Sequence, residues 1–144
     1  MVWGIASYAG VGPILFGQNR TLVRQFFEEE STEFYKSASD AVTTDYFKEA
    51  GVFVFYDKAD SCEAVEFTKP ATVKWREQQL MPLPLGEVLE FMRSQDEDLE
   101  EDESGFTSYK NGIGGYTEDI EELTELAETI ICFRQGYYSV GLAE

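Results

Sequence analysis

Apolar residues show helical spacing in one segment of the chain. Four of them stand at positions i, i+3, i+4 and i+7, which would place all four on one face of an α-helix. The spacing therefore predicts an amphipathic helix over Leu85–Met92. The four residues are Leu85, Val88, Leu89 and Met92.

Capping signals predict two further helices. Asn19 is a favourable N-cap residue, so a helix is expected from Arg20 to about Glu29. Thr117 would cap a short acidic helix that runs to about Glu128. The inward apolar residues would be Leu22, Val23, Phe26 and Phe27 in the first of these helices and Ile120, Leu123 and Leu126 in the second.

Strand patterns predict two antiparallel hairpins. In the first, a β-branched and aromatic run over Val52–Tyr56 is followed by polar turn residues and then by alternating apolar positions from Cys62 to Phe67. The second hairpin spans residues 105–116 and turns near Asn111-Gly112. Thr129–Phe133 is expected to be a buried strand, whereas the pattern leaves the type of the segment 34–48 open.

Together these elements predict an α+β fold in one compact domain over residues 1–144, with antiparallel hairpins packed on two or three helices. The order helix, hairpin, helix, hairpin also indicates a weak pseudo-repeat. LVRQFF, DYF and VFVFYD in the first half are echoed by EVLEFM, SGF and IGGY in the second. Either an internal duplication or the ordinary recurrence of such elements in α+β proteins would explain this similarity.

Composition agrees with a folded domain that has no membrane span. Of the 144 residues, 43% are hydrophobic and 15% aromatic, which is enough to form a core. No stretch approaches the roughly 20 apolar residues of a spanning helix, and the start lacks the basic region of a signal peptide. Cys62 and Cys132 lie in apolar runs, so we expect buried free thiols rather than a disulfide, and a cytoplasmic location.

Charge is both large and unevenly distributed. The chain has 28 acidic and 11 basic residues and a net charge of −17. Such a protein is repelled by nucleic acids and anionic membranes, so its expected partner is a basic protein. The segment 87–128 carries 15 of the acids and only two bases, Arg93 and Lys110, which gives it a net charge of −13. Residues 1–86 are therefore nearly neutral, and residues 87–144 form an acidic half.

The composition also excludes most of the common catalytic and metal-binding sites. The chain has no histidine, which excludes Ser-His-Asp and Cys-His arrangements and removes the commonest metal ligand. Two cysteines are too few for a cysteine-rich zinc site. We therefore expect neither an enzyme nor a bound cofactor or metal.

The sequence also allows two other functions, a hydrolase that uses a carboxylate and a module that binds a divalent cation. Glu66 lies among apolar residues and would be the carboxylate of a hydrolase, although an ion pair with Lys69 or Lys74 explains it more simply. The loop 96–105 resembles a calcium loop that begins at Glu100, but Asn111 stands where a bidentate glutamate is required. A solvated acidic loop is the simpler interpretation.

The best local explanation of the acidic half is a protein-binding face. Tyrosine is enriched at protein interfaces, and surrounding carboxylates would attract a cationic partner. Tyr137 and Tyr138 belong to the same aromatic group, and covering the sheet would account equally well for any one tyrosine. The expected contact residues are Asp96, Asp98, Glu100, Glu101, Asp102, Glu103, Tyr109, Tyr116, Glu118, Asp119 and Glu122.

Four segments also resemble a known group of proteins. GVGPILFGQNRTLVRQFF, VFYDKADSCEAVEF, DEDLEEDESGFTSYKNGIGGY and IICFRQGYY are similar, in that order, to small acidic bacterial immunity proteins of contact-dependent growth inhibition and other polymorphic toxin systems. The resemblance implies a cytosolic binding protein without enzymatic activity that neutralises one cognate toxin domain. Many such toxins are basic nucleases. An acidic DNA mimic that inhibits a nucleic-acid-binding protein is the alternative within the binding class.

Overall fold

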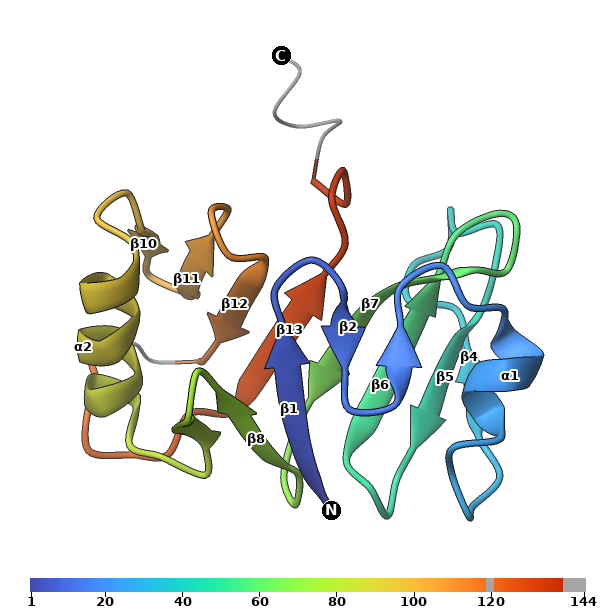
Figure 1. The fold of residues 1–144 in the computed structure, drawn as a ribbon, viewed down its shortest axis with the longest axis horizontal. Helices are drawn as coiled ribbons and strands as arrows, with labels where there is room; N and C mark the ends of the chain where they lie inside the picture. Colours follow the sequence, from blue (N-terminus) through green and yellow to red (C-terminus); the bar gives the residue numbers. More distant parts are fainter. Residues whose placement is uncertain (119–120, 139–144) are drawn as a thin grey trace.

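The computed structural model describes residues 1–118 and 121–138 and contains two β-sheets and two helices (Figure 1). The smaller sheet has the strand order β3-β2-β1-β8-β9. Its strands are antiparallel except for β1 and β8, which pair in parallel. They are β1 (Val2–Ala6), β2 (Gly10–Val11), β3 (Ile14–Leu15), β8 (Thr72–Trp75) and β9 (Gln78–Met81).

The larger sheet is antiparallel throughout and has the order β10-β11-β12-β13-β7-β6-β5-β4. Helix α1 (Arg20–Arg24) precedes one four-stranded meander and α2 (Leu85–Gln95) precedes the other. The two meanders meet where β7 pairs with β13. Each helix is therefore followed by four antiparallel strands of the large sheet, although β8 and β9 of the small sheet lie between the two units in the chain. The strands are β4 (Thr32–Phe34), β5 (Thr44–Phe47), β6 (Val52–Tyr56), β7 (Cys62–Phe67), β10 (Glu100–Asp102), β11 (Gly105–Ser108), β12 (Ile113–Tyr116) and β13 (Thr129–Phe133).

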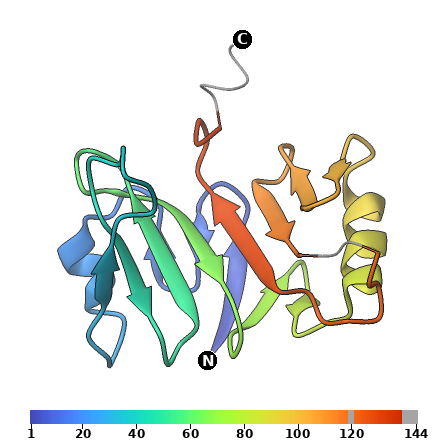
Figure 2. The same ribbon diagram turned by 180° about the vertical axis from the view of Figure 1, so that it is seen from behind.

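The main core lies between the two sheets and contains residues of both chain halves. Trp3 of β1 packs on Phe67 of β7, with ring centroids 5.5 Å apart. The inward face of α2 closes one end of this core, and Val23 of α1 contributes to the other. Viewed from behind, the large sheet lies in front of the small one (Figure 2).

The large sheet also has an outer face, which turns away from the small sheet. Phe55, Ala64, Ile131 and Phe133 form a second apolar cluster there. Tyr137 and Tyr138, from the turn that follows β13, pack on this cluster. The structure is therefore a mixed domain dominated by strands. We expected the hairpins to pack on helices, but they pack mainly on the second sheet. The sequence does not predict this sheet, because its strands of two to five residues are too short to show a clear hydrophobic periodicity.

Local predictions were confirmed where the apolar periodicity was strong. The first hairpin is β6–β7, the second is β11–β12, and Leu85, Val88, Leu89 and Met92 are the buried residues of α2. Asn19 caps α1 through its side-chain oxygen, which accepts a hydrogen bond from Leu22 N at 2.9 Å. This helix ends at Arg24 rather than Glu29, and Phe27 beyond it stacks on Phe47 at 3.7 Å. The segment 34–48 holds the end of β4 and all of β5.

The predicted acidic helix over 117–128 was wrong. Residues 121–128 instead run along the N-terminus of α2, where Leu85 N donates to Glu125 O and Gly86 N donates to Leu123 O. Pro84, the N-cap of α2, provides no side-chain cap, so these carbonyls satisfy helix amides that would otherwise lack partners. Leu123 and Leu126, expected to point inward, are 48% and 53% exposed, and Ile120 lies outside the described residues.

A buried ion pair fastens α1 to the large sheet. The Asp45 carboxylate on β5 is fully buried and accepts hydrogen bonds from Arg20 Nη1 at 3.1 Å, Arg24 Nη2 at 2.8 Å and Tyr56 Oη at 2.9 Å. Burial alone would raise the pKa of Asp45. The hydrogen bonds from Arg24 and Tyr56 and the charges of both arginines more than offset it, so the pKa lies below its usual 3.8.

The two cysteines are free and buried, as expected. Burial raises the pKa of Cys62 to about 12 and raises that of Cys132 as well. Because the thiolate is the reactive form, neither residue should be modified by iodoacetamide in the native protein at mildly alkaline pH. Mass spectrometry should find no adduct before denaturation and two afterwards. Native modification at the rate of a free thiol would contradict the burial of these side chains.

No helix among residues 1–118 and 121–138 is both long and apolar enough to cross a lipid bilayer.

Candidate partner-binding site

Strand β10, at one edge of the large sheet, forms an acidic hollow together with β11 and β12. The hollow has a volume of about 320 Å³. Three carboxylates and two tyrosines line it, and within the described part of the chain no basic residue does. Its main side chains are Glu100, Glu101, Asp102, Thr107, Tyr109 and Tyr116. The structure thus brings together five of the residues expected from the sequence.

Glycines and a short polar turn determine the shape of the hollow. Asp102 Oδ1 accepts hydrogen bonds from Ser104 N at 2.8 Å and Ser104 Oγ at 2.9 Å, which closes the β10–β11 turn. Gly105 has a φ of 152°, and a Cβ there would lie 1.9 Å from Gly115 O. A Cβ on Gly115 would lie 2.5 Å from the Phe106 ring. Side chains at these two positions would therefore force the strands apart.

The three carboxylates of β10 differ in what they can offer a partner. Glu101 pairs with Phe106, an inward residue, and forms a two-pronged ion pair with Arg93 of α2 at 2.6 and 2.9 Å. The hydrogen bond from Arg93 lowers the pKa of Glu101. Glu100 and Asp102 point to the other side of the strand and have no ion pair among the described residues. They therefore supply the uncompensated charge of the hollow.

The tyrosine walls are held by the C-terminal turn. Tyr138 packs on Phe133 of the outer face with centroids 4.9 Å apart, and its hydroxyl lies 2.8 Å from that of Tyr116. Tyr138 also meets the edge of Tyr109 at 5.9 Å. Tyr8 Oη donates a hydrogen bond to the carbonyl of Tyr109. Burial and then the charge of Glu100 raise the pKa of Tyr109, so its hydroxyl is a donor near neutral pH.

Asp96 was placed wrongly among the exposed contact residues. Its side chain is buried, where Oδ2 accepts a hydrogen bond from Ser108 Oγ at 2.7 Å and Oδ1 accepts one from Asp98 N at 2.9 Å. It ends α2 and ties that helix to β11. The run of acids in the sequence gives no sign that its first member turns inward.

The other expected acids that the structure describes do not line the hollow. Asp98, Glu103, Glu118 and Glu122 are exposed. Glu103 lies with Arg93 and Glu121 around a neighbouring depression beside α2. Glu122 belongs to the segment 121–128, which runs along the N-terminus of α2. Asp119 lies outside the described residues.

Four residues add to the site beyond the expected set. Gly105, Phe106 and Thr107 line the hollow, and Tyr138 positions both of its tyrosines. The Tyr137-Tyr138 pair after a buried strand is a visible sequence signal, but the polar Thr107 is not distinguishable from other strand residues. Among the described residues no group of three or more metal-ligating side chains is close enough to hold an ion.

Glu66 occupies the outer face of β7, opposite Phe53 on one neighbouring strand and Ile131 on the other. Among residues 1–118 and 121–138, Glu66 forms no ion pair, so the expected pair with Lys69 or Lys74 is not formed. Burial raises the pKa of Glu66, and Lys36 is the cation that acts against this rise.

Comparison of the chain with models of protein families, with curated proteins and with solved structures finds no match in any of the three. The function is therefore inferred from the geometry and charge of the chain itself.

Proposed function

We propose that this protein is an immunity protein that binds a basic toxin domain in the cytoplasm and neutralises it by covering its active site or substrate groove. The observation that carries this proposal is the acidic hollow, which combines uncompensated carboxylates with two tyrosines. A binding protein without enzymatic activity is the role that this chemistry supports best.

The hollow has the composition of an interface for cationic side chains. Tyrosine rings offer a rigid apolar surface, attract cations over their faces and carry a hydroxyl for hydrogen bonds. Glu100 and Asp102 would meet the arginine or lysine residues with which a nuclease holds phosphates. Occupation of those residues would remove them from the substrate, which is the inhibition that we propose.

The rest of the acidic half would act at longer range. The net charge of −17 creates a field that accelerates the approach of a basic protein and weakens as salt is added. Close contacts at the hollow would then determine which basic protein stays bound. Charge alone would give fast encounters without this selectivity.

The proposal is tested by a growth assay with the product of the neighbouring gene. The domain at the C-terminus of a large secreted protein encoded immediately upstream is produced in a bacterial host with and without this chain. We expect growth arrest by that domain alone and recovery of growth when this chain is co-produced. A purified one-to-one complex should form between the two.

The control is an unrelated acidic protein of similar size, which should not restore growth. Arrest that persists in the presence of this chain would contradict the proposal, as would equal recovery with the unrelated protein.

A further inference from the structure

A lysine of the chain itself occupies a cation position on the outer face of the large sheet. Lys36 Nζ lies 4.3 Å from the centroid of the Phe55 ring and donates a hydrogen bond to Tyr137 Oη at 3.2 Å. Phe55 is buried, and Tyr137 reaches over it from the turn after β13. An aromatic face and a hydroxyl acceptor thus surround an ammonium group, which is the arrangement that recognises basic side chains.

Carboxylates complete this position. Glu66 stands beside it on β7, and among the described residues its carboxylate accepts no hydrogen bond. Glu63, at the bulge where β7 leaves register with β6, shares Arg134 with Asp57 at distances of 3.5 and 2.8 Å. The Arg134 guanidinium therefore pairs with two carboxylates, and the charge of Lys36 acts on both Glu63 and Glu66.

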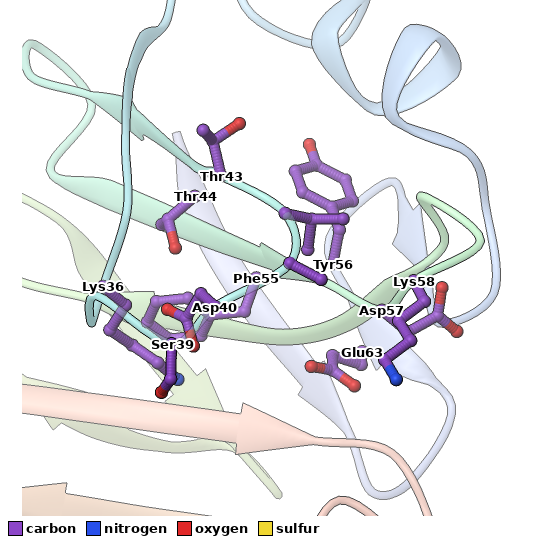
Figure 3. Close-up of a pocket in the computed structure, with 12 residues that line it drawn as sticks. Lys36, Ser39, Asp40, Thr43, Thr44, Phe55, Tyr56, Asp57, Lys58 and Glu63 are labelled. Carbon is purple, nitrogen blue, oxygen red and sulfur yellow. The ribbon is translucent and has the colours of Figure 1, made fainter.

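A cavity of about 440 Å³ opens next to Lys36, between the loop 36–44 and strands β6 and β7. Figure 3 shows Lys36, Ser39 and Asp40 on the loop side and Asp57, Lys58 and Glu63 on the other. The cavity is large enough for an arginine side chain. Its walls carry three carboxylates, from Asp40, Asp57 and Glu63.

The part of this loop that carries Lys36, residues 36–40, is attached lightly, whereas Val42 packs on the main core and Thr43 accepts hydrogen bonds from Arg20. Among the residues that the structure describes, Ser37, Ser39 and Asp40 form hydrogen bonds only with one another. Lys36 itself is exposed, so its ammonium can move into water at little cost in solvation. Few buried contacts would be lost if residues 36–40 shifted.

We propose that this cavity is a socket for one basic side chain of a protein partner, arginine or lysine, which replaces the Lys36 ammonium over the Phe55 ring. The basic character of the partner rests on the proposed function. The socket lies on the same outer face as Tyr116 and Tyr138, so a partner seated at the acidic hollow would extend across the sheet to reach it.

Charge balance favours an exchange of cations over simple insertion. A second cation beside Lys36 would be repelled, whereas a cation that displaces it leaves the local charge unchanged. Until that exchange occurs, Lys36 lowers the apparent affinity by the fraction of time for which it covers the ring. Removal of the lysine charge should therefore strengthen binding to a basic side chain.

The test uses a capped Gly-Arg-Gly tripeptide as the probe, titrated into the ¹⁵N-labelled full chain and followed by NMR at an ionic strength of about 0.15 M, where distant charges are screened. The same tripeptide with citrulline in place of arginine has nearly the same shape without the charge. We expect Lys36→Met to bind the arginine peptide about fivefold more tightly than the unaltered protein. Shifts should centre on Phe55, Glu63 and Glu66, and citrulline should give none.

Lys58→Met is the matched control. Lys58 lines the same cavity, but among the residues that the structure describes it forms no cation–π contact. It should change the affinity by less than about twofold. Phe55→Leu in the Lys36→Met background should abolish the gain, with folding checked by the NMR spectrum. Equal effects of Lys36→Met and Lys58→Met, or shifts centred elsewhere, would overturn the socket. Because the probe is a peptide, this result is independent of whether a toxin is neutralised.

Discussion

Replacement of Asp45 by alanine is expected to lower the free energy of unfolding by about 3–5 kcal/mol. The change leaves Arg20, which is buried at the interface between α1 and the large sheet, without its buried carboxylate partner. It also leaves the buried Tyr56 hydroxyl without its acceptor. Chemical denaturation followed by circular dichroism measures the loss.

Asp60 provides a control that contacts the same arginine. Its carboxylate accepts from Arg20 Nε at 2.9 Å, but the side chain is half exposed. Asp60→Ala should therefore cost less than about 1 kcal/mol, because water replaces most of the interaction. Similar losses for the two variants would show that burial does not determine the strength of this pair.

The Asp45 contribution should also depend on pH in a defined direction. Its pKa is lowered in the folded state, so the stabilisation is present above the ordinary pKa of 3.8 and disappears as the pH falls through the folded value. The difference in stability between the unaltered protein and Asp45→Asn should accordingly shrink below about pH 4.

The second large effect is expected at the acidic hollow. Combined replacement of Glu100 and Asp102 by lysine should weaken binding to the toxin identified by the growth assay by about a hundredfold or more. The reversal replaces attraction by like-charge repulsion, which costs several kcal/mol at close range. Isothermal titration calorimetry at two salt concentrations measures the loss and its screening.

Glu87 and Glu90, both exposed on α2, provide the matched control. Their combined replacement by lysine changes the net charge by the same amount away from the hollow. This control should lower the affinity by less than about tenfold and mainly slow association. Equal losses for the two pairs would place the contact elsewhere on the acidic half.

The sequence predicts those elements whose own side chains determine their conformation. Helix α2 and the β6–β7 hairpin follow from regular apolar spacing, and Asn19 identifies the start of α1. The segment 121–128 has a helical pattern too, but its carbonyls are used by the amides of α2. A tertiary hydrogen bond of this kind leaves no trace in local periodicity.

The candidate site was predictable in composition and less so in geometry. Glu100, Asp102, Tyr109 and Tyr116 converge because hairpin pairing brings β10, β11 and β12 together. The inward turn of Asp96 depends on Ser108, twelve residues away, and so could not be read from a run of acids. Lys36 meets Phe55 and Tyr137 only through the folded loop, and nothing in the sequence around it indicates this contact.

The pairing of β7 with β13 has a consequence for how the protein is made. Strand β13 lies beside β7 in the middle of the large sheet, but it is synthesised only after β8 to β12. Until it emerges, the apolar strand β7 remains an open edge that is able to pair with other chains. Synthesis therefore leaves this edge open while residues 68–128 are made, and the many acidic residues of that segment would keep nascent molecules apart.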